Sequence, residues 1–441
     1  MTYDVGIMNP MHRKLIVSLL ETTMKKNLFM YFITIISIVF TLPSHALSIV
    51  PNVSLEKVLQ NYATIAHAKY EDALMCARTL DSAIETLVTT PNKKNLENAR
   101  LQWIRARIPY QQSEVYRFGN KIVDTWDKKV NAWPLDEGFI DYVDSSYGKE
   151  NEENNLYTAN IIANSKIIVN EKEIDLSIIS PDLLRKLHRA NGIDTNITTG
   201  YHVIEFLLWG QDLKTNVREP GNRPYTDFDI GNCTGGHCRR RVEYLKVVSK
   251  ILVSDLEEMM KAWGPDGQAT KDLMKDINAG LNSIITGMTS LSYNELAGER
   301  MNLGLILHDP EQEIDCFSDN TYASYLNDVI GIISSYTGEY IRMNGEKIHG
   351  ASIHDLISHN NRNLAQEIND KFSNTMKDFH ILKDRAENIE SFDQMISENN
   401  PEGNKIVRNL INDLITQTES LRKIRIALDL IEPNRVIGNV P

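Results

Sequence analysis

The sequence lacks several features that mark common classes of protein. Only 4 of its 441 residues are cysteine, and hydrophobic and charged residues make up 42% and 24%. This balance is typical of an ordinary globular protein and excludes a disordered or collagen-like chain. Basic residues are outnumbered by acidic ones, 47 to 59, so the formal net charge is −12. An acidic chain is repelled by phosphate backbones, and no nucleic-acid partner is expected.

The sequence also lacks the short motifs of the commonest enzymes. It has no His-Glu-x-x-His pair of a zinc protease, no Gly-x-Ser-x-Gly nucleophile elbow, no phosphate-binding loop and no dinucleotide fingerprint. Whether the chain is an enzyme is therefore left open at this point, with a binding role favoured.

One long hydrophobic run stands near the start of the chain. Residues 28–42 are mostly apolar, Lys25 and Lys26 precede them, and small residues stand at Ser44 and Ala46. A basic segment, an apolar run and small residues are typical of a secretory signal peptide, here cleaved after Ala46. An uncleaved membrane anchor is the alternative, disfavoured because a run of 15 residues is short for a bilayer.

The position of this run bears on the start and the destination of the chain. Signal peptides usually begin close to their basic residues, so a start at Met24 is an alternative to Met1. No cysteine follows the run, and a lipoprotein is not indicated. We expect residues 1–46 to be a signal-peptide region and the mature chain to be exported to the periplasm or cell envelope, either free or held at a membrane.

Export would bring the cysteines into an oxidising compartment. Cys233 and Cys238 are separated by four residues that include two glycines, which let the chain turn back on itself, so a disulfide is predicted there. A zinc knot with His237 as third ligand is the alternative, disfavoured because no second pair with zinc-site spacing follows. The pairing of Cys76 and Cys316 is left open.

Helical periodicity runs through most of the chain. Apolar residues recur at steps of three and four from about Ser54 to Leu87, which predicts a long amphipathic helix. Pro91 and Asn92 would end it, and a second helix is predicted over residues 94–118. Later helical patterns cover residues 245–259, 281–285, 321–342, 362–390 and 404–430. The predicted fold class is therefore all-α.

The length of the chain predicts roughly two domains. The helix, turn and helix of residues 54–118 is echoed after residue 244, around Gly264 to Gly267. This echo suggests two tandem helical bundles related by duplication, which we assign to residues 47–225 and 226–441.

A less regular region lies between these patterns. Residues 147–199 show little helical periodicity and are predicted to form a small irregular insertion on the helical body. The only β-like signal of the chain falls within it, at residues 160–169, where a short strand or hairpin is expected.

The predicted second helix carries five aromatic or charged residues at steps of four and three, so that they share one face. They are Trp103, Arg107, Tyr110, Glu114 and Arg117. A solvated stripe with a ladder of charge pairs is the alternative to a functional face. Pro109 removes a backbone hydrogen bond and is expected to bend the helix.

A second candidate stretch joins an aromatic-proline corner to two acids. Residues 130–137 end in Asp136 and Glu137. A structural turn explains most of this stretch, and one of the two acids is the candidate to point into a site.

Residues 200–210, from Gly200 to Gly210, place a histidine and a carboxylate in an otherwise apolar helical segment. His202 and Glu205 are three residues apart, so they project from the same face. A buried carboxylate needs a partner, and two ligands on one helical turn are common in metal sites of bundles. The alternative is a core histidine whose ring the glutamate holds.

Several of these blocks, in this order along the chain, resemble the imelysin family. The Gly-x-His-x-x-Glu segment around His202 matches the family signature, and further blocks cover most of the mature chain. They are Trp103 with Arg107, Tyr110 and Glu114, then residues 131–137, 233–241 and 316–321. The resemblance implies an exported all-α protein of two related bundles with a functional cleft between them. It also implies a link to iron regulation and uptake, in a family filed among metallopeptidases.

The resemblance implies roles for particular residues. His202 and Glu205 are the signature pair, Glu114 is the expected third metal ligand, and Arg107 would set its charge. Gln111 stands where some metal-binding relatives have a second carboxylate. The residues expected to support the site or bind ligand are Arg107, Tyr110, Gln111, Trp103, Asp136, Glu137 and Gly200. Tyr322 and Tyr325 stand in a block where many relatives have histidines, which puts an additional histidine ligand set in doubt.

These observations lead to one favoured function and two alternatives. We expect an envelope protein that binds a divalent transition metal, iron or zinc, or an iron compound, as part of metal uptake, because imidazole and carboxylates suit these ions. The alternatives are a zinc peptidase using His202 and Glu205, and a structural envelope protein. Partners other than the ligand and possible uptake components, and the oligomeric state, are left open.

Overall fold

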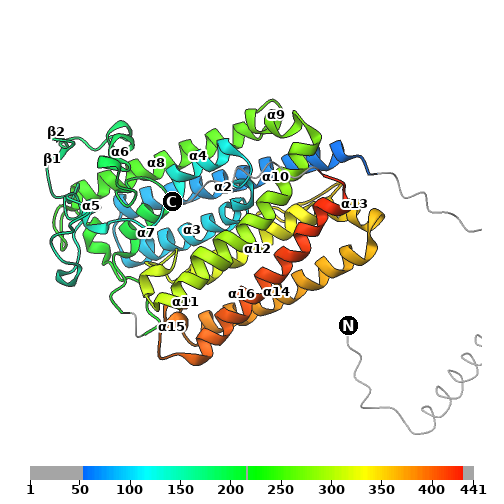
Figure 1. The fold of residues 1–441 in the computed structure, drawn as a ribbon. Helices are drawn as coiled ribbons and strands as arrows, with labels where there is room; N and C mark the ends of the chain where they lie inside the picture. The colour runs from blue at the N-terminus through cyan, green and yellow to red at the C-terminus, as the bar shows by residue number, and fades with distance from the viewer. Residues whose placement is uncertain (1–52, 215–216, 431–441) are drawn as a thin grey trace, which may run out of the picture. The chain divides into compact units, whose positions relative to one another are not determined.

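The computed structural model describes residues 53–214 and 217–430, and helices dominate this part of the chain (Figure 1). The predicted all-α class is confirmed. The predicted signal peptide, its cleavage site and Met24 lie outside the described residues. Within the described part, no helix combines the length and the apolar character needed to cross a membrane.

The first helices begin and end close to where the periodicity places them. Helix α2 (Leu55–Thr89) starts directly after Ser54, and the side chain of Asn92 caps α3 (Lys93–Gln111) by accepting a hydrogen bond from the Asn95 amide. The further helices up to residue 214 are α4 (Lys121–Val130), α5 (Glu137–Ile140), α6 (Pro181–Leu187) and α7 (Tyr201–Trp209).

The predicted end of the second helix, near residue 118, is wrong. Helix α3 ends at Gln111, and a short 3-10 turn, η1 (Glu114–Tyr116), follows. Both the amide and the hydroxyl of Ser113 donate to the Tyr110 carbonyl oxygen, at 2.8 and 2.6 Å. This tighter turn replaces the next α-helical turn, so Glu114 lies beyond the helix on which it was predicted.

The remaining helices follow residue 217. They are α8 (Cys238–Ala262), α9 (Gln268–Met274), α10 (Ile277–Ser290), α11 (Leu303–Leu307), α12 (Thr321–Thr337), α13 (Ile353–Asn360), α14 (Arg362–Asn388), α15 (Phe392–Ile396) and α16 (Pro401–Ala427), with a π-helical segment at Leu291–Asn302 between α10 and α11. Short 3-10 turns lie at Ser145–Tyr147, Ala190–Gly192, Tyr225–Phe228 and Pro310–Gln312.

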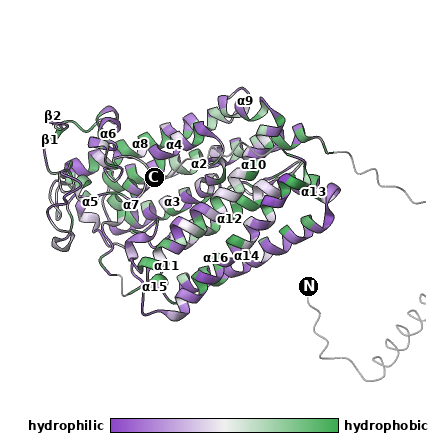
Figure 2. Ribbon diagram, viewed as in Figure 1, coloured by the Kyte–Doolittle hydropathy of each residue, from purple (hydrophilic) through white to green (hydrophobic). Residues whose placement is uncertain are grey.

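The long helices are amphipathic and share one core. Figure 2 shows hydrophobic and hydrophilic residues on each of the long helices. Helix α2 packs against α3 and α8, and α14 packs against α16. One continuous cluster of buried apolar side chains runs from Val58 in α2 to Ile424 in α16. Helix α8 follows the predicted domain boundary at residue 225, whereas α2 precedes that boundary, and the two helices pack against each other. The division into two bundles stays a prediction.

Short antiparallel hairpins correct two details of the sequence analysis. In the region 147–199, the hairpin joins β1 (Lys166–Val169) to β2 (Lys172–Asp175), later than the predicted residues 160–169. A second hairpin, β3 (Glu339–Ile341) with β4 (Lys347–His349), shows that the first region does not hold the only β structure.

The second hairpin also explains why α12 is shorter than predicted. The helix ends at Thr337 because Gly338 adopts a left-handed conformation, with φ of 66°. An added Cβ there would lie 2.8 Å from Asn61 Nδ2 on α2, so the glycine also permits a close approach between distant segments.

A fully buried lysine joins α2 to the turn after α3. Lys69 Nζ donates to the Gln112 carbonyl oxygen at 3.0 Å and lies 5.2 Å from the centre of the Tyr116 ring. Burial lowers the pKa of Lys69 to about 7. Because the unfolded chain keeps this proton up to the ordinary lysine pKa, it binds more protons than the folded chain between pH 7 and 10, and folding stability rises with pH there.

We expect the substitution Lys69→Met to remove this pH dependence. The free energy of unfolding of the wild type minus that of Lys69→Met should rise by up to about 1.4 kcal/mol per pH unit between pH 7 and 10. Urea denaturation at several pH values measures the difference. Lys57→Met, on the exposed side of α2, is the control and should show no slope; parallel curves for Lys69→Met would contradict the prediction.

Candidate metal site

Helix α7, which carries the predicted histidine and glutamate, is buried along its whole length. It begins after Gly200, whose φ is +100°. A Cβ at this position would lie 2.5 Å from the Val130 carbonyl oxygen. Only glycine meets both demands, so Gly200 allows the start of the helix to lie against the end of α4.

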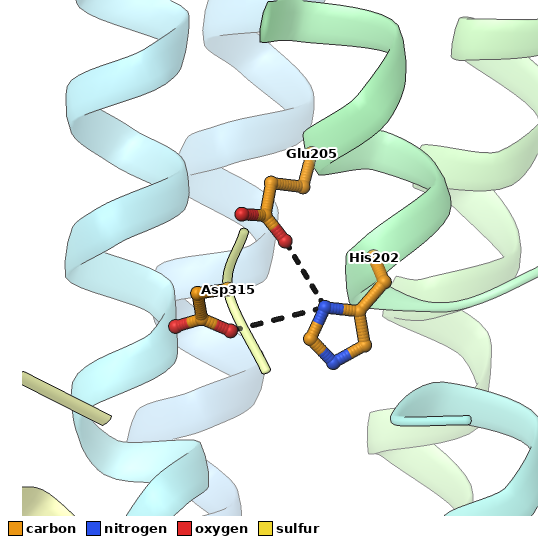
Figure 3. Close-up of side chains that lie close together, drawn as sticks. All are labelled: His202, Glu205 and Asp315. Carbon is orange, nitrogen blue, oxygen red and sulfur yellow. Dashed lines mark hydrogen bonds and ion pairs between the residues drawn. The ribbon is translucent and has the colours of Figure 1, made fainter. Parts of the chain in front are cut away.

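Three buried side chains converge on one point beside this helix (Figure 3). His202 Nδ1 lies 3.0 Å from Glu205 Oε2 and 3.8 Å from Asp315 Oδ1. Asp315 belongs to the segment between α11 and α12. Each of the three residues offers one ligand atom, these atoms lie within 4.8 Å of one another, and each residue is at most 1% exposed. One imidazole nitrogen and two carboxylate oxygens form a donor set that suits a transition metal.

Arg107, from α3, holds Asp315 in place. Its Nη2 donates to Asp315 Oδ1 at 2.7 Å, and its Nη1 donates to Asn131 Oδ1 at 2.6 Å. The guanidinium carbon lies 5.5, 5.7 and 5.2 Å from the ring centres of Trp103, Tyr110 and Tyr201. Arg107 is 1% exposed. The alternative of a solvated stripe on this helix is therefore wrong, because the face packs inward around the arginine.

Glu114 was predicted as the third metal ligand, a call that stays a prediction, and the acid that lies beside His202 and Glu205 is Asp315. Asn131 lies between Glu114 and His202, donating from Nδ2 to Glu114 Oε1 at 2.9 Å. Arg300 Nη2 donates to Glu114 Oε2 at 3.2 Å. Burial raises the pKa of Glu114, but Arg117 and Arg300 outweigh it and hold the pKa below its ordinary value. Glu114 is thus linked to His202 by hydrogen bonds through the side-chain amide of Asn131.

The amide of Asn131 also determines which nitrogen of His202 carries the proton. Its NH₂ group faces Glu114, so its oxygen faces Arg107 and His202 Nε2, the latter at 3.1 Å. Because this oxygen can only accept, Nε2 must be the donor. Nδ1 is then free of hydrogen in the neutral ring and presents its lone pair to Glu205 and Asp315.

The three groups differ in their ionisation. Burial, helped by Arg107, lowers the pKa of His202 to about 3, so the ring is neutral at neutral pH. Burial and the charge of Asp315 raise the pKa of Glu205 well above its ordinary value. Burial acts in the same direction on Asp315, but the charge of Arg107 outweighs it and holds the pKa of Asp315 below the ordinary value. Because Nδ1 carries no hydrogen, its 3.0 Å contact with Glu205 Oε2 is a hydrogen bond when Glu205 is the protonated donor, and the raised pKa of Glu205 favours that form. Asp315 is the ionised carboxylate of the site.

Ser318, in the same segment as Asp315, binds the other oxygen of Glu205. Its amide and hydroxyl donate to Glu205 Oε1 at 3.1 and 2.7 Å. The segment therefore contacts both residues of the helical pair, one through a carboxylate and one through hydrogen-bond donors.

The other residues predicted to support the site have separate positions. Trp103 Nε1 donates to the Tyr201 carbonyl oxygen at 2.9 Å, which anchors the first turn of α7 to α3. The hydroxyl of Tyr110 donates to Asp127. Gln111 is fully buried, and neither of its amide atoms has a hydrogen-bond partner among the described residues.

The two acids of the aromatic-proline corner lie outside the His202 group. Asp136 Oδ2 accepts from Thr195 Oγ1 and from Asn154 Nδ2, each at 2.5 Å, which is a structural role. Glu137 lines a pocket of about 200 Å³ together with Glu311. Burial, with a smaller contribution from Glu311, raises the pKa of Glu137 to about 8.

A larger cavity of about 560 Å³ lies on another side of the site. Asn131 and Ile314, the neighbour of Asp315, line it with Trp133, Asp127 and Arg300. Residues from two distant parts of the chain, 117–194 and 295–314, thus form its wall. The buried histidine lies one side chain, Asn131, behind this wall.

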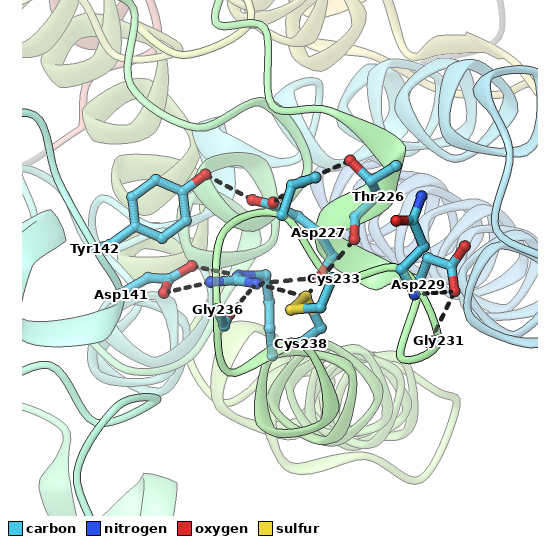
Figure 4. Close-up of a disulfide and its surroundings, with 12 residues drawn as sticks. Asp141, Tyr142, Thr226, Asp227, Asp229, Gly231, Cys233, Gly236 and Cys238 are labelled. Carbon is cyan, nitrogen blue, oxygen red and sulfur yellow. Dashed lines mark hydrogen bonds and ion pairs between the residues drawn. A yellow bond between two sulfur atoms is a disulfide. The ribbon is translucent and has the colours of Figure 1, made fainter.

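The sulfur atoms of Cys233 and Cys238 form a disulfide that joins the preceding loop to the first residue of α8 (Figure 4). With both sulfurs bonded, no thiolate remains for the alternative zinc knot. Arg241 anchors this loop by donating to the Gly236 carbonyl oxygen at 3.0 Å and to Asp141 Oδ2 at 2.6 Å. Cys76 and Cys316 are free and buried.

Asp315, Asn131 and Ser318 were not predicted as site residues. Asn131 and Ser318 lie in blocks that carry the family resemblance, and Asp315 directly precedes one of them. The residues that the sequence singled out in or beside these blocks were Asp136, Glu137, and Tyr322, which stands where many relatives have histidines. Because Arg107 and Asp315 are 208 residues apart in sequence, no periodicity could indicate that they pair.

Fold and site together define an all-α protein with a buried histidine and carboxylate centre. The family model described as Imelysin (Peptidase_M75) matches residues 66–421, which is most of the sequence. The chain belongs to the imelysin family.

Two known proteins are also similar to this chain. A stretch of 60 residues is 35% identical to "Iron-regulated protein A" of Synechococcus elongatus; it covers 14% of this chain and only 17% of that protein. The crystal structure of a candidate iron-regulated protein A precursor from Parabacteroides distasonis matches with a TM-score of 0.61 at 17% identity, over 85% of this chain and 94% of that one. At this identity the second match supports the fold alone.

We expect Gly200→Ala to destabilise the site helix by at least roughly 3 kcal/mol, because it combines left-handed strain with a clash against Val130. Gly192→Ala is the matched control. Gly192 also has a positive φ, 73°, but nothing lies within 4 Å of its added Cβ. The control should lose only roughly 1–2 kcal/mol. Urea denaturation measures both, and equal losses would show that the close approach to Val130 is not decisive.

Proposed function

We propose that this protein binds a divalent transition metal ion, iron before zinc, as cargo through His202, Glu205 and Asp315. The observation that supports this proposal most strongly is the convergence of three ligand atoms, one nitrogen and two oxygens, within 4.8 Å. Metal uptake is the process in which we expect the bound ion to take part.

The donor set fits such an ion. A neutral imidazole with its lone pair at Nδ1 can ligate without first losing a proton, and Asn131 orients the ring from the opposite side. Imidazole combined with carboxylates suits iron, zinc and copper better than magnesium or calcium. When bound, the ion would supply the positive charge that allows Glu205 to ionise beside Asp315.

Binding has two costs that residues of the site determine. Glu205 must lose the proton that it donates to His202 Nδ1 at 3.0 Å, and its raised pKa opposes this loss. The ion must also share Asp315 with Arg107, which lies 2.7 Å from the same oxygen. Both costs lower the affinity, which is consistent with a cargo that must be released again.

Export is part of the proposal. The basic residues and apolar run before Ala46 support a cleaved signal peptide. The disulfide near α8 also supports an oxidising compartment, the periplasm or cell envelope, because such bonds are rare in the cytosol. The name of the relative from Synechococcus elongatus, iron-regulated protein A, supports the link to iron.

The proposal is tested by anaerobic calorimetric titration with Fe²⁺, and separately with Zn²⁺, of protein first treated with a chelator. We expect one tight site for Fe²⁺ or Zn²⁺ in the wild type, and a loss of affinity of more than about 100-fold at this site in Glu205→Gln. The glutamine keeps the shape of the protonated glutamate and its donor to Nδ1, so the fold should be retained. Titration in buffers of different ionisation enthalpy should show release of about one proton per ion at pH 7, because only Glu205 is protonated.

Glu243→Gln, an exposed change on α8, is the control and should bind as the wild type does. Asp315→Asn gives a second variant that removes a ligand. Equal affinities in the wild type and Glu205→Gln would contradict the proposal. Cleavage of a denatured protein that disappears in Glu205→Gln would instead support the peptidase alternative.

A further inference from the structure

A second group of carboxylates lies in the same chain segment that supplies Asp315. Glu313 and Asp319, on either side of Asp315, meet Asp393 in the first turn of α15. One oxygen from each of the three lies within 4.8 Å of the others. Glu313 and Asp393 are 1% and 3% exposed.

Two oxygens of this group have no partner. Glu313 Oε2 and Asp319 Oδ1 are buried, and neither has a hydrogen-bond partner among the described residues. No lysine, arginine or histidine in the described part of the chain forms an ion pair with any of the three carboxylates. Buried carboxylates ordinarily accept hydrogen bonds or pair with a cation, as Asp315 does with Arg107. The missing partner is therefore a cation or a hydrogen-bond donor, and no residue in the described part of the chain provides it.

We propose that Glu313, Asp319 and Asp393 bind a second divalent cation, of the class that prefers oxygen ligands, such as Mn²⁺ or Ca²⁺. Three carboxylates without imidazole or thiolate form a hard donor set, which favours Ca²⁺, Mg²⁺ and Mn²⁺ over Zn²⁺. The site is distinct from the His202 group in its ligands and in its preferred ion, and it does not depend on the proposed function.

The surroundings of the three carboxylates are acidic and attract a cation. Asp212 lines a pocket of about 200 Å³ together with Glu137 and Glu311. Asp212 acts electrostatically on Glu313, Asp319 and Asp393 alike. Arg218 acts on Asp319 from beyond ion-pair distance, while its guanidinium donates to the carbonyl oxygens of Ala386 and Glu387. The local field is thus negative on the side of the pocket.

The position of the site gives the cation a structural role. Asp393 is held by the hydroxyl of Ser391, at the start of α15, between the long helices α14 and α16. A cation shared by Asp393, Glu313 and Asp319 would join this corner to the segment that carries Asp315 and Ser318. Occupancy should therefore order the segment that completes the His202 group.

The test is thermal unfolding of the full mature chain after removal of metals, in chelator and then with Mn²⁺, Ca²⁺, Mg²⁺ or Zn²⁺. We expect Mn²⁺ or Ca²⁺ to raise the Tm of the wild type by on the order of 5 °C at saturation, and Zn²⁺ to raise it less through these carboxylates. Asp319→Asn should melt no lower than the wild type in chelator, because it removes mutual repulsion. Asp319→Asn should also lose most of the rise in Tm that Mn²⁺ or Ca²⁺ causes. Its affinity for Mn²⁺, measured by calorimetry, should be at least tenfold weaker than that of the wild type.

Two further variants separate this site from the other. Glu205→Gln, which damages the His202 group, should keep the full response to Mn²⁺ or Ca²⁺, and so should Glu398→Gln, an exposed change close to α15. A response lost in Glu205→Gln and kept in Asp319→Asn would overturn the proposal and assign the effect to the His202 group. A wild type whose Tm none of the four cations raises would overturn it as well.

Discussion

The buried ion pair between Arg107 and Asp315 is the interaction on which the rest of the site depends. It joins α3 to a segment 208 residues later, at 2.7 Å, with both residues at most 1% exposed. Removing one partner of such a pair leaves a buried charge and typically costs about 3–5 kcal/mol. The pair therefore constrains every neighbour. Asn131 must turn its oxygen to the arginine, and that choice gives His202 its proton at Nε2.

The same pair determines the chemical state of the His202 group. Because Arg107 keeps Asp315 ionised, the second carboxylate beside it, Glu205, holds its proton, and the imidazole stays neutral. The group is close to electrically balanced without an ion. Under the proposed function, an arriving cation displaces a proton and competes with a guanidinium, which makes binding sensitive to pH and readily reversible.

The segment between α11 and α12 connects the two candidate sites. Asp315 and Ser318 serve the His202 group, and Glu313 and Asp319 meet Asp393 on α15. The first set is fully paired by hydrogen bonds and by Arg107, whereas the second leaves buried oxygens without partners. This contrast is the physical reason for proposing an ion of different preference at the second group and a structural role for it.

The sequence by itself determined the helical fold class, most helix positions, and the pair formed by His202 and Glu205, because periodicity and spacing within one helix are local properties. The sequence singled out Gly200 as part of the signature segment. It did not show why glycine is required there, because the close approach to Val130 exists only in the folded chain. Tertiary structure alone decided that α3 ends before Glu114, that Asn131 separates Glu114 from His202, and that Asp315 lies beside His202 and Glu205. These outcomes depend on contacts between residues far apart in the chain, which spacing along one helix cannot reveal.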